Sequence, residues 1–278
     1  MKKNVKLAAP LIIIIAIIIA ALFFFVYKNG VLKTGAIKVS GNIEATDVRL
    51  SFRVAGQVEE LLADEGSVLK AGEIVARLNT DELVKIRNRE AASLKAAEFQ
   101  VVQDGTDFVR AENLFNVGAI PAQKRDLAKT KADSSRALVD QLRSSLELAN
   151  TRLAFAELAS PINGYVIVKS AEAGEVVQMG APIFTAIDLN DVWLTAYINE
   201  SDLGRVKLNQ KAYVKTDTYP FKRYNGRISF ISQQAEFTPK QIQTTEERVK
   251  LVYRVKIKCD NSNLELKPGM PADGYIIE

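Results

Sequence analysis

A short glycine-containing pattern occurs twice in this sequence, and it constrains the fold more than any other feature. Its glycines are offset by 108 residues: Gly56, Gly66 and Gly72 in the first copy, and Gly164, Gly174 and Gly180 in the second. The apolar residues Val58 and Val68 fall by the same shift on Val166 and Val176, which disfavours a chance alignment of glycines. We therefore predict one small β unit present as two halves, residues 51–79 and 160–188.

The residues between the two halves, 80–159, predict a helical hairpin. In both arms apolar and small residues follow alternating steps of three and four, the period of an antiparallel coiled coil. The predicted contact positions of the first arm, Asp81–Asn116, are Leu94, Ala97, Val101, Asp104, Phe108, Ala111 and Phe115. Those of the second arm, Pro121–Ala156, are Ala128, Ala132, Ser135, Val139, Leu142, Leu146, Ala149, Leu153 and Ala156.

The expected ends of these helices have familiar signals. Thr80 is a candidate N-cap of the first helix, and Gly118 suits the left-handed backbone that ends it. Pro121 suits the first turn of the second helix, and Pro161 is expected to stop it. Gly105, inside the first helix, should weaken it by about 1 kcal/mol relative to alanine.

Several apolar residues of the hairpin lie off the predicted contact positions: Ala91, Ala92, Ala96, Leu127 and Leu138. Lateral packing against the hairpin of another copy would explain them, and so would the ordinary use of helix-forming residues on a solvated face. These residues alone leave both explanations open.

The N-terminal residues predict a membrane anchor. Leu7 to Tyr27 contains no charged residue and would span about 31 Å as a helix, close to the hydrocarbon thickness of a bilayer. A cleaved signal peptide is the alternative, but the apolar run is long and does not end in a small-residue cleavage site. Lys2, Lys3 and Lys6 predict that residues 1–6 are cytoplasmic, that 7–27 span the membrane once, and that the residues beyond about 30 lie outside.

The net charge of +4 belongs to this N-terminal end, because Lys2, Lys3, Lys6 and Lys28 account for all of it. The neutral remainder argues against a nucleic-acid partner, which would require a basic face.

The remaining residues predict further β structure. Short strands separated by turns in residues 189–258 indicate a small β-barrel. Residues 28–50 with 259–278 are predicted to form a separate membrane-proximal β domain, in which the C-terminal tail pairs with the segment 37–50. The predicted fold is therefore mostly β with a long α-helical hairpin.

The chemistry available to this chain is limited. It has no histidine, which removes the commonest general base and metal ligand. No phosphate-binding loop, paired-cysteine motif or nucleophile turn is present. Cys259 is the only cysteine and falls on the apolar side of a predicted strand, so we expect a buried small residue. We predict no enzymatic activity, no cofactor and no metal.

The duplicated β unit resembles the two halves of a biotinyl-lipoyl domain. In the acyl-carrier forms of that fold the modified lysine lies at the turn joining the halves. Here the hairpin occupies that position, and no Met-Lys-Met turn is present. A membrane-tethered carrier or scaffold is therefore an alternative function.

The anchor, split lipoyl-like unit, hairpin and barrel together resemble the HlyD-type membrane fusion proteins. The segment Ala159–Val166 carries the most specific likeness. Phe237–Lys240, Gln243-Thr244, Glu247-Arg248 and Leu266–Met270 are similar to the branch paired with ABC-type exporters. The resemblance implies a periplasmic adaptor that assembles as a ring, often a hexamer, and links an inner-membrane transporter to a TolC-like outer-membrane channel. The transporter implied is ABC-type, with a proton-driven exporter as the alternative.

The same resemblance implies that the hairpin tip docks the channel. Arg110 and Leu114 match the family's tip pattern and Asp126 matches the acidic residue that follows, but Pro121 stands where the family has serine. The candidate docking residues are Arg110, Leu114, Asn116, Val117, Gly118, Ala119, Ile120 and Pro121.

Overall fold

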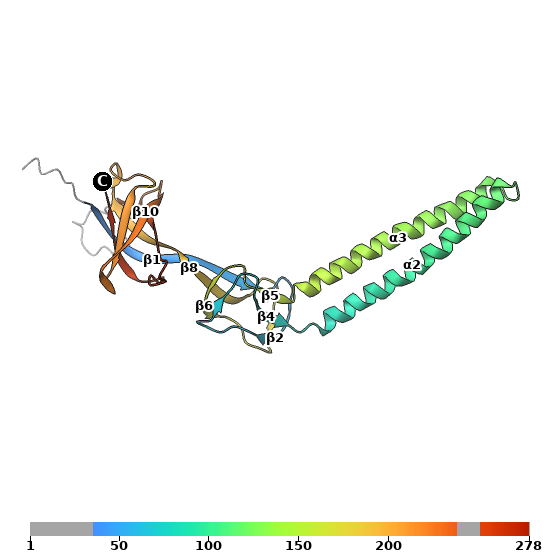
Figure 1. Cartoon of the computed structure of the whole chain (residues 1–278), viewed down its shortest axis with the longest axis horizontal. Coiled ribbons are helices and arrows are strands. Elements are labelled where there is room, and N and C mark those ends of the chain that lie inside the picture. Colours follow the sequence, from blue (N-terminus) through green and yellow to red (C-terminus); the bar gives the residue numbers. More distant parts are fainter. Residues whose placement is uncertain (1–35, 238–250, 278) are drawn as a thin grey trace, which may run out of the picture. The chain divides into compact units, whose positions relative to one another are not determined.

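The structure is a computed structural model that describes residues 36–237 and 251–277. These residues form two compact units, one of residues up to Thr46 together with Leu189 onward, and one of Asp47–Asp188 (Figure 1). Within the described ranges no helix is long and apolar enough to cross a membrane. The predicted tail (1–6) and anchor (7–27) lie outside the described residues. Residues 238–248, which carry part of the similarity to adaptors of ABC-type exporters, also lie outside them.

The Asp47–Asp188 unit contains the duplicated β structure. The first half supplies β2 (Gly56–Leu61), β3 (Val68–Leu69) and β4 (Ile74–Leu78). The second half supplies β6 (Gly164–Lys169), β7 (Val176–Val177) and the beginning of β8 (Pro182–Asn199). Each strand of the second half begins 108 residues after its counterpart, so the repeat in the sequence is confirmed as a repeat in the backbone.

The two halves exchange strands. β2 pairs with β7, and β3 pairs with β6, so each half completes the other's sheet. The connecting hydrogen bonds are also duplicated: the Gly174 N–H donates to the Val58 carbonyl at 2.8 Å, and the Gly66 N–H donates to the Val166 carbonyl at 2.9 Å. Phe52 and Phe184, one from each half, are both fully buried in the shared core.

The repeated glycines serve two purposes. The turn glycines all have the left-handed backbone that disfavours other residues: Gly66, Gly72, Gly174 and Gly180. Gly164 instead lies where two strands approach closely, because a Cβ there would be 2.1 Å from the Ile187 carbonyl oxygen. Its counterpart Gly56 faces only the Leu78 side chain, at 3.2 Å.

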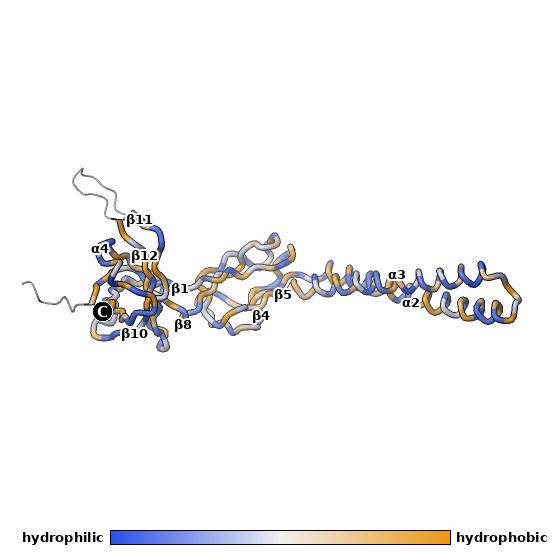
Figure 2. The backbone as a smooth tube through the Cα atoms, turned by 90° about the horizontal axis from the view of Figure 1, so that it is seen from above, coloured by the Kyte–Doolittle hydropathy of each residue, from blue (hydrophilic) through white to orange (hydrophobic). Residues whose placement is uncertain are grey.

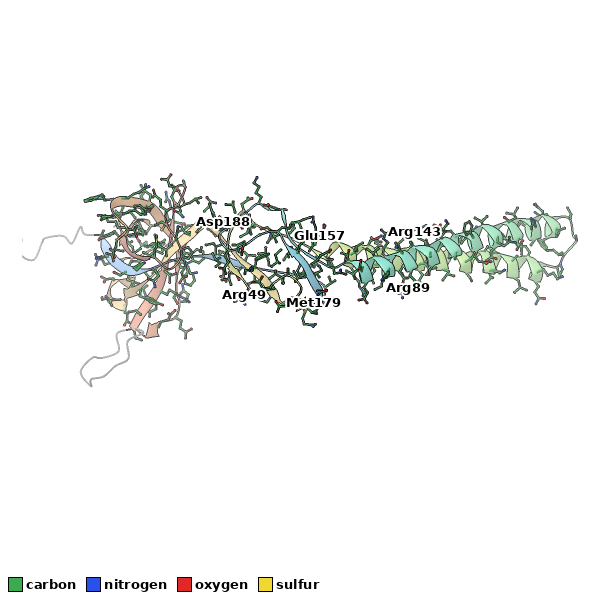
Figure 3. All side chains as sticks on the ribbon, turned by 90° about the horizontal axis from the view of Figure 1, so that it is seen from below. Arg49, Arg89, Arg143, Glu157, Met179 and Asp188 are labelled. Atoms are coloured by element: carbon green, nitrogen blue, oxygen red, sulfur yellow. The ribbon has the colours of Figure 1, made fainter. Side chains whose placement is uncertain are left out.

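The hairpin consists of α2 (Asp81–Asn116) and α3 (Ala122–Ala154), which pack side by side (Figures 1 and 2). Along the chain the hairpin follows β4 and precedes β5 (Glu157–Ala159). All the predicted contact positions are buried or half-buried, with Ala132 only 1% exposed. Small residues at these positions let the helices approach closely. The outer faces carry the charges, including Arg89 on α2 and Arg143 on α3 (Figure 3).

The predicted helix ends were right for the position of Thr80 and wrong for Pro121 and Pro161. Thr80 holds the N-cap position of α2, but its side chain makes no cap bond; the Asn79 carboxamide oxygen accepts the Asp81 N–H instead, at 3.1 Å. The second helix begins at Ala122 rather than Pro121 and ends at Ala154, well before Pro161. It ends early because the Ala156 carbonyl accepts a hydrogen bond from the Leu78 N–H of β4, at 2.9 Å.

The other unit is a closed β-barrel. Its strands are β1 (Ile37–Ser51), the later part of β8, β9 (Lys211–Thr216), β10 (Tyr219–Ile231), β12 (Leu251–Cys259) and β13 (Pro271–Ile276). Their order is β12-β10-β9-β13-β1-β8, and β12 also pairs with β8, which closes the barrel. The short helix α4 (Glu200–Leu203) follows β8, and β11 (Glu236–Phe237) pairs with β12.

The predicted pairing of the C-terminal tail with the segment 37–50 is confirmed, since Ile37 lies opposite Ile276. The predicted division into a membrane-proximal domain and a separate barrel was wrong for the described residues. The other edge of β13 pairs with β9, and its residues join the same core. Gly274 allows this, because a Cβ there would approach the Ile257 and Leu194 side chains to 2.8 Å.

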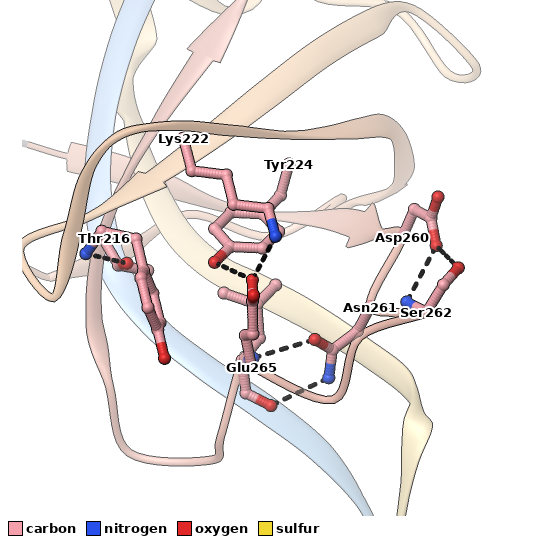
Figure 4. A network of polar contacts seen from close by, with 9 residues as sticks. Thr216, Lys222, Tyr224, Asp260, Asn261, Ser262 and Glu265 are labelled. Atoms are coloured by element: carbon pink, nitrogen blue, oxygen red, sulfur yellow. Dashed lines mark hydrogen bonds and ion pairs between the residues drawn. The ribbon is translucent and has the colours of Figure 1, made fainter.

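Polar contacts fix the barrel loop that follows β12 (Figure 4). The buried Asn261 side chain donates to the carbonyls of Leu189 and Leu266, at 2.7 and 2.9 Å. The Glu265 carboxylate accepts hydrogen bonds from Lys222 and Tyr224, which hold its pKa below the usual range. Cys259 is buried as expected, and burial raises the pKa of its thiol to about 12.

Candidate functional site: the hairpin tip

The turn between α2 and α3 is compact and hydrogen-bonded. α2 ends at Asn116, and Gly118 takes the left-handed conformation predicted for it, with φ of 77°. The Gly118 N–H donates to the Phe115 carbonyl at 2.9 Å, and the Ala119 N–H donates to the Leu114 carbonyl at 2.8 Å. The last carbonyls of the helix are thereby satisfied, so the tip has a defined shape.

The tip presents apolar side chains to solvent. Val117 is 77% exposed and Leu114 is 47% exposed, whereas Ile120 is half-buried. The other predicted docking residues of the turn, Asn116, Gly118, Ala119 and Pro121, are also exposed. An exposed apolar cluster on an ordered turn is a feature typical of a protein contact surface.

Arg110 extends this surface along α2. Residues 110, 114 and 117 are separated by four and three positions, so Arg110 and Leu114 share one helix face that leads to Val117. The Arg110 side chain is 69% exposed and pairs with Asp107 at 3.3 Å. The structure thus places the Arg110 cation beside the apolar residues of the tip.

Two features of the tip were not predicted from the sequence. The Arg125 guanidinium lies over the Phe115 ring at 4.5 Å, a contact that ties the first turn of α3 to the end of α2. Arg125 also pairs with its neighbour Asp126 at 2.8 Å. A surface hollow of about 580 Å³ lies beside this contact. It is lined by Phe108, Val109, Glu112, Asn113, Arg125, Asp126 and Lys129. Cross-helix cation–π contacts of this kind have no signature in the linear sequence.

A buried polar cluster lies further along the hairpin. The Asp104 carboxylate is 2% exposed and forms an ion pair with Lys131 of the other helix at 2.9 Å. The Gln100 side chain also donates to it, at 2.7 Å. These contacts lower the pKa of Asp104, and the hydrogen bond from Lys131 is the largest cause. One polar pair among apolar contacts favours a single alignment of the two helices.

The hairpin also replaces the turn on which an acyl carrier would hold its modified lysine. β4 and β5 pair directly, with Ile74 opposite Ala159, and the chain between them forms α2 and α3. Among the described residues, no group of three or more cysteine and acidic side chains is placed to hold a metal ion. The geometry therefore defines a protein whose Asp47–Asp188 unit presents a long helical hairpin.

Comparisons with known proteins agree with this class. Residues 46–188, which are more than half of the chain, match the CzcB-like barrel-sandwich hybrid domain, and residues 192–273 match the YknX-like beta-barrel domain. The chain belongs to the CzcB-like barrel-sandwich hybrid family and is a membrane fusion protein of the HlyD type.

Solved structures show the same fold at low sequence identity. The membrane fusion protein Spr0693 from Streptococcus pneumoniae is 14% identical, with a TM-score of 0.70 over 87% of this chain and 98% of its own. MacA from Actinobacillus actinomycetemcomitans is 20% identical, with a TM-score of 0.65 over 88% of this chain and 79% of its own. ZneB from Cupriavidus metallidurans is 23% identical, with a TM-score of 0.50 over 87% and 70%.

Proposed function

We propose that this protein is a non-enzymatic periplasmic adaptor that links an inner-membrane exporter to a TolC-like outer-membrane channel. The observation that carries the proposal is the ordered hairpin tip, which exposes Leu114 and Val117 beside Arg110. α2 has 36 residues and is therefore about 54 Å long. A hairpin of this length serves as a spacer that holds its tip away from the duplicated β structure of residues 51–79 and 160–188, which we call the β sandwich.

We propose that the adaptor assembles as a ring of copies, with a hexamer as the expected number. Exposed apolar residues along α2 support lateral contacts between hairpins. Phe99, Val102 and Val109 are 67%, 68% and 57% exposed, and Ala92 and Ala96 are also exposed. On α3, Leu127 and Leu138 are 64% and 43% exposed. A ring would join individually weak tip contacts into one strong attachment.

For the membrane end, we propose a single N-terminal anchor at residues 7–27, with residues 1–6 in the cytoplasm and the body in the periplasm. The apolar run and its flanking lysines support this topology. The favoured transporter is ABC-type, on the similarity carried by Leu266–Met270 and the segment 237–248. A proton-driven exporter is the alternative partner.

A membrane-tethered carrier is the alternative function from another class. The pairing of β4 with β5 disfavours it, because the turn that would present a modified lysine is absent from the β sandwich. Mass spectrometry of the purified protein tests this alternative, and we expect no lysine acylation.

Retention of the channel by tagged, full-length protein tests the proposed function. Val117→Asp places a charge in the proposed contact, and we expect about tenfold less channel to co-purify, since burying an unpaired charge costs more than about 1.4 kcal/mol. Leu148→Asp is the matched control, because Leu148 is also exposed (53%) but lies near the other end of α3. Equal retention by both variants would contradict a docking role for the tip.

A further inference from the structure

The barrel loop between α4 and β9 exposes an apolar side chain that the proposed adaptor role does not use. Leu208 in this loop is 60% exposed, and Ile277 beside it is 45% exposed. The two residues line an open hollow of about 610 Å³ together with Arg205, Lys207 and Gln210. We call Lys207–Lys211 with Ile277 the Leu208 surface.

The exposure of Leu208 follows from an ordered loop. The Gln210 side chain accepts the Lys207 N–H at 2.7 Å and donates to the Ile277 carbonyl at 3.0 Å. Asn209 has a positive φ of 64°, and its N–H donates to the Ile228 carbonyl at 2.9 Å. Val206 is buried at 6% and anchors the loop in the core. The backbone thus holds Leu208 outward, where its exposure costs free energy unless something covers it.

Positive charge surrounds these apolar residues. Lys207 and Lys211 are exposed, and neither forms an ion pair within residues 36–237 and 251–277. Arg205, also beside the loop, pairs with Asp202 at 2.9 Å. On the neighbouring outer face of β9 and β13, Tyr213 stacks on Tyr275 at 4.9 Å. Exposed aliphatic side chains with lysines and tyrosines are the composition of protein surfaces at a bilayer interface.

The proposed anchor would bring this surface near the membrane. β1 begins at Ile37, opposite Ile276, and the Ile277 N–H donates to the Lys211 carbonyl at 2.9 Å. The Leu208 surface therefore lies at the end of the barrel where β1 begins. The predicted anchor ends at Tyr27, and ten residues span at most about 35 Å. The tether keeps this end at a high local concentration beside the bilayer.

We propose that the Leu208 surface binds the headgroup region of an anionic bilayer, with Leu208 and Ile277 entering the acyl boundary and Lys207 and Lys211 contacting lipid phosphates. This inference rests on the N-terminal anchor of the proposed function, but it requires neither transporter nor channel. Lipid is the proposed occupant, because the exposed lysines complement lipid phosphate and the anchor keeps the surface within reach of the bilayer. Contact with lipid would orient the barrel relative to the membrane.

The test uses full-length protein reconstituted in nanodiscs, with Cys259 replaced by serine. An environment-sensitive fluorophore is attached at Leu208→Cys, or at Thr218→Cys as the matched control. Thr218 is exposed in the turn between β9 and β10, at the opposite end of β9. Emission is recorded in phosphatidylcholine alone and in phosphatidylcholine mixed with phosphatidylglycerol.

We expect a blue shift at position 208 that grows with phosphatidylglycerol, and no shift at position 218. Lys207→Gln, combined with Leu208→Cys, should lower the ratio of membrane-bound to unbound barrel surface about fivefold. This is the effect of removing one basic residue near an anionic surface. Identical emission at both positions in both lipids would overturn the proposal. A shift at 208 that appears only after the transporter is added would also overturn it, by assigning the surface to a protein contact.

Discussion

The β sandwich and the helical hairpin belong to one compact unit, yet they are held together differently. In the sandwich the backbones of the paired strands β6 and β8 approach so closely that a Cβ on Gly164 would meet the Ile187 carbonyl oxygen at 2.1 Å. In the hairpin only a narrow row of side chains is buried, and Gly105 of α2 has no atom within 4 Å of its Cβ position. The sandwich is therefore constrained at its backbone, whereas the hairpin has outer faces free to carry contacts.

The largest effect should come from the closest approach of strands. Gly164→Ala forces a Cβ against a backbone oxygen, and we expect it to destabilise the sandwich by about 3 kcal/mol or more. Gly56→Ala, its counterpart in the repeat, meets only the flexible Leu78 side chain and should cost less than about 1 kcal/mol. Urea unfolding followed by circular dichroism measures both. Equal costs would contradict the contrast between the two halves.

Within the hairpin, the contact row should be the sensitive part. Ala132 is 1% exposed between the helices, so Ala132→Leu should force them apart and cost about 2 kcal/mol. Ala137→Leu on the exposed face of the same helix is the control and should change stability by less than about 0.5 kcal/mol. Thermal melts of the helical signal compare them. A small effect at Ala132 would show that the helices do not pack as described.

At the tip, a substitution at Gly118 should change stability through backbone conformation alone. Gly118 has a φ of 77° and open space around its Cβ position, so Gly118→Ala tests only the left-handed backbone. We expect a loss of about 1 kcal/mol in the same melts. Gly118→Asn should recover part of this loss, because asparagine tolerates that conformation. The absence of any recovery would point to a cause other than backbone strain.

Gly105 should behave in the opposite way. Gly105→Ala replaces the poorest ordinary helix former with the best at an uncrowded position in α2, so we expect a gain of about 1 kcal/mol. This single residue then distinguishes the hairpin from the sandwich, where the same substitution at Gly164 is destabilising. A measured loss at Gly105 would reveal a neighbour, such as a second hairpin, that occupies the open space.

The smallest effect concerns pH. Lys131 and Gln100 lower the pKa of Asp104 in the folded state, so its ionised form stabilises the hairpin. That contribution is complete above the unfolded-state value of about 4 and disappears as the pH falls through the folded-state pKa. Asp104→Asn should therefore flatten the loss of helix stability below about pH 4. An unchanged profile in Asp104→Asn would contradict this contribution.

Much of the fold was readable in the sequence because its signals were periodic. The offset of 108 located both halves of the sandwich, and alternating steps of three and four located the contact row of the hairpin. The errors arose where tertiary contacts override local signals. Proline at 161 did not end α3, because the Ala156 carbonyl is already committed to Leu78 of the sheet. The single barrel was missed because the pairing of β13 with two strands is set by packing around Gly274.

The hairpin tip, too, was predictable where local sequence signals determine the structure and not where tertiary contacts do. The sequence located the turn and predicted Gly118 as the end of α2, because the left-handed conformation has a residue preference. It could not predict that Arg125 would stack on Phe115, since this contact depends on how two helices align. The degree of exposure at Val117 and Val109 also depends on that alignment. The contribution of these side chains to docking remains a prediction.

In-cell cross-linking from single cysteines at the tip tests directly whether the tip docks an outer-membrane channel. Cysteines are placed one at a time at Asn116, Ala119 and Ala122, all exposed, with Cys259 replaced by serine. A cysteine at Lys207 of the barrel is the control. We expect capture of an outer-membrane channel from the tip positions and not from Lys207. Capture of neighbouring copies alone, without a channel, would contradict the docking role of the tip.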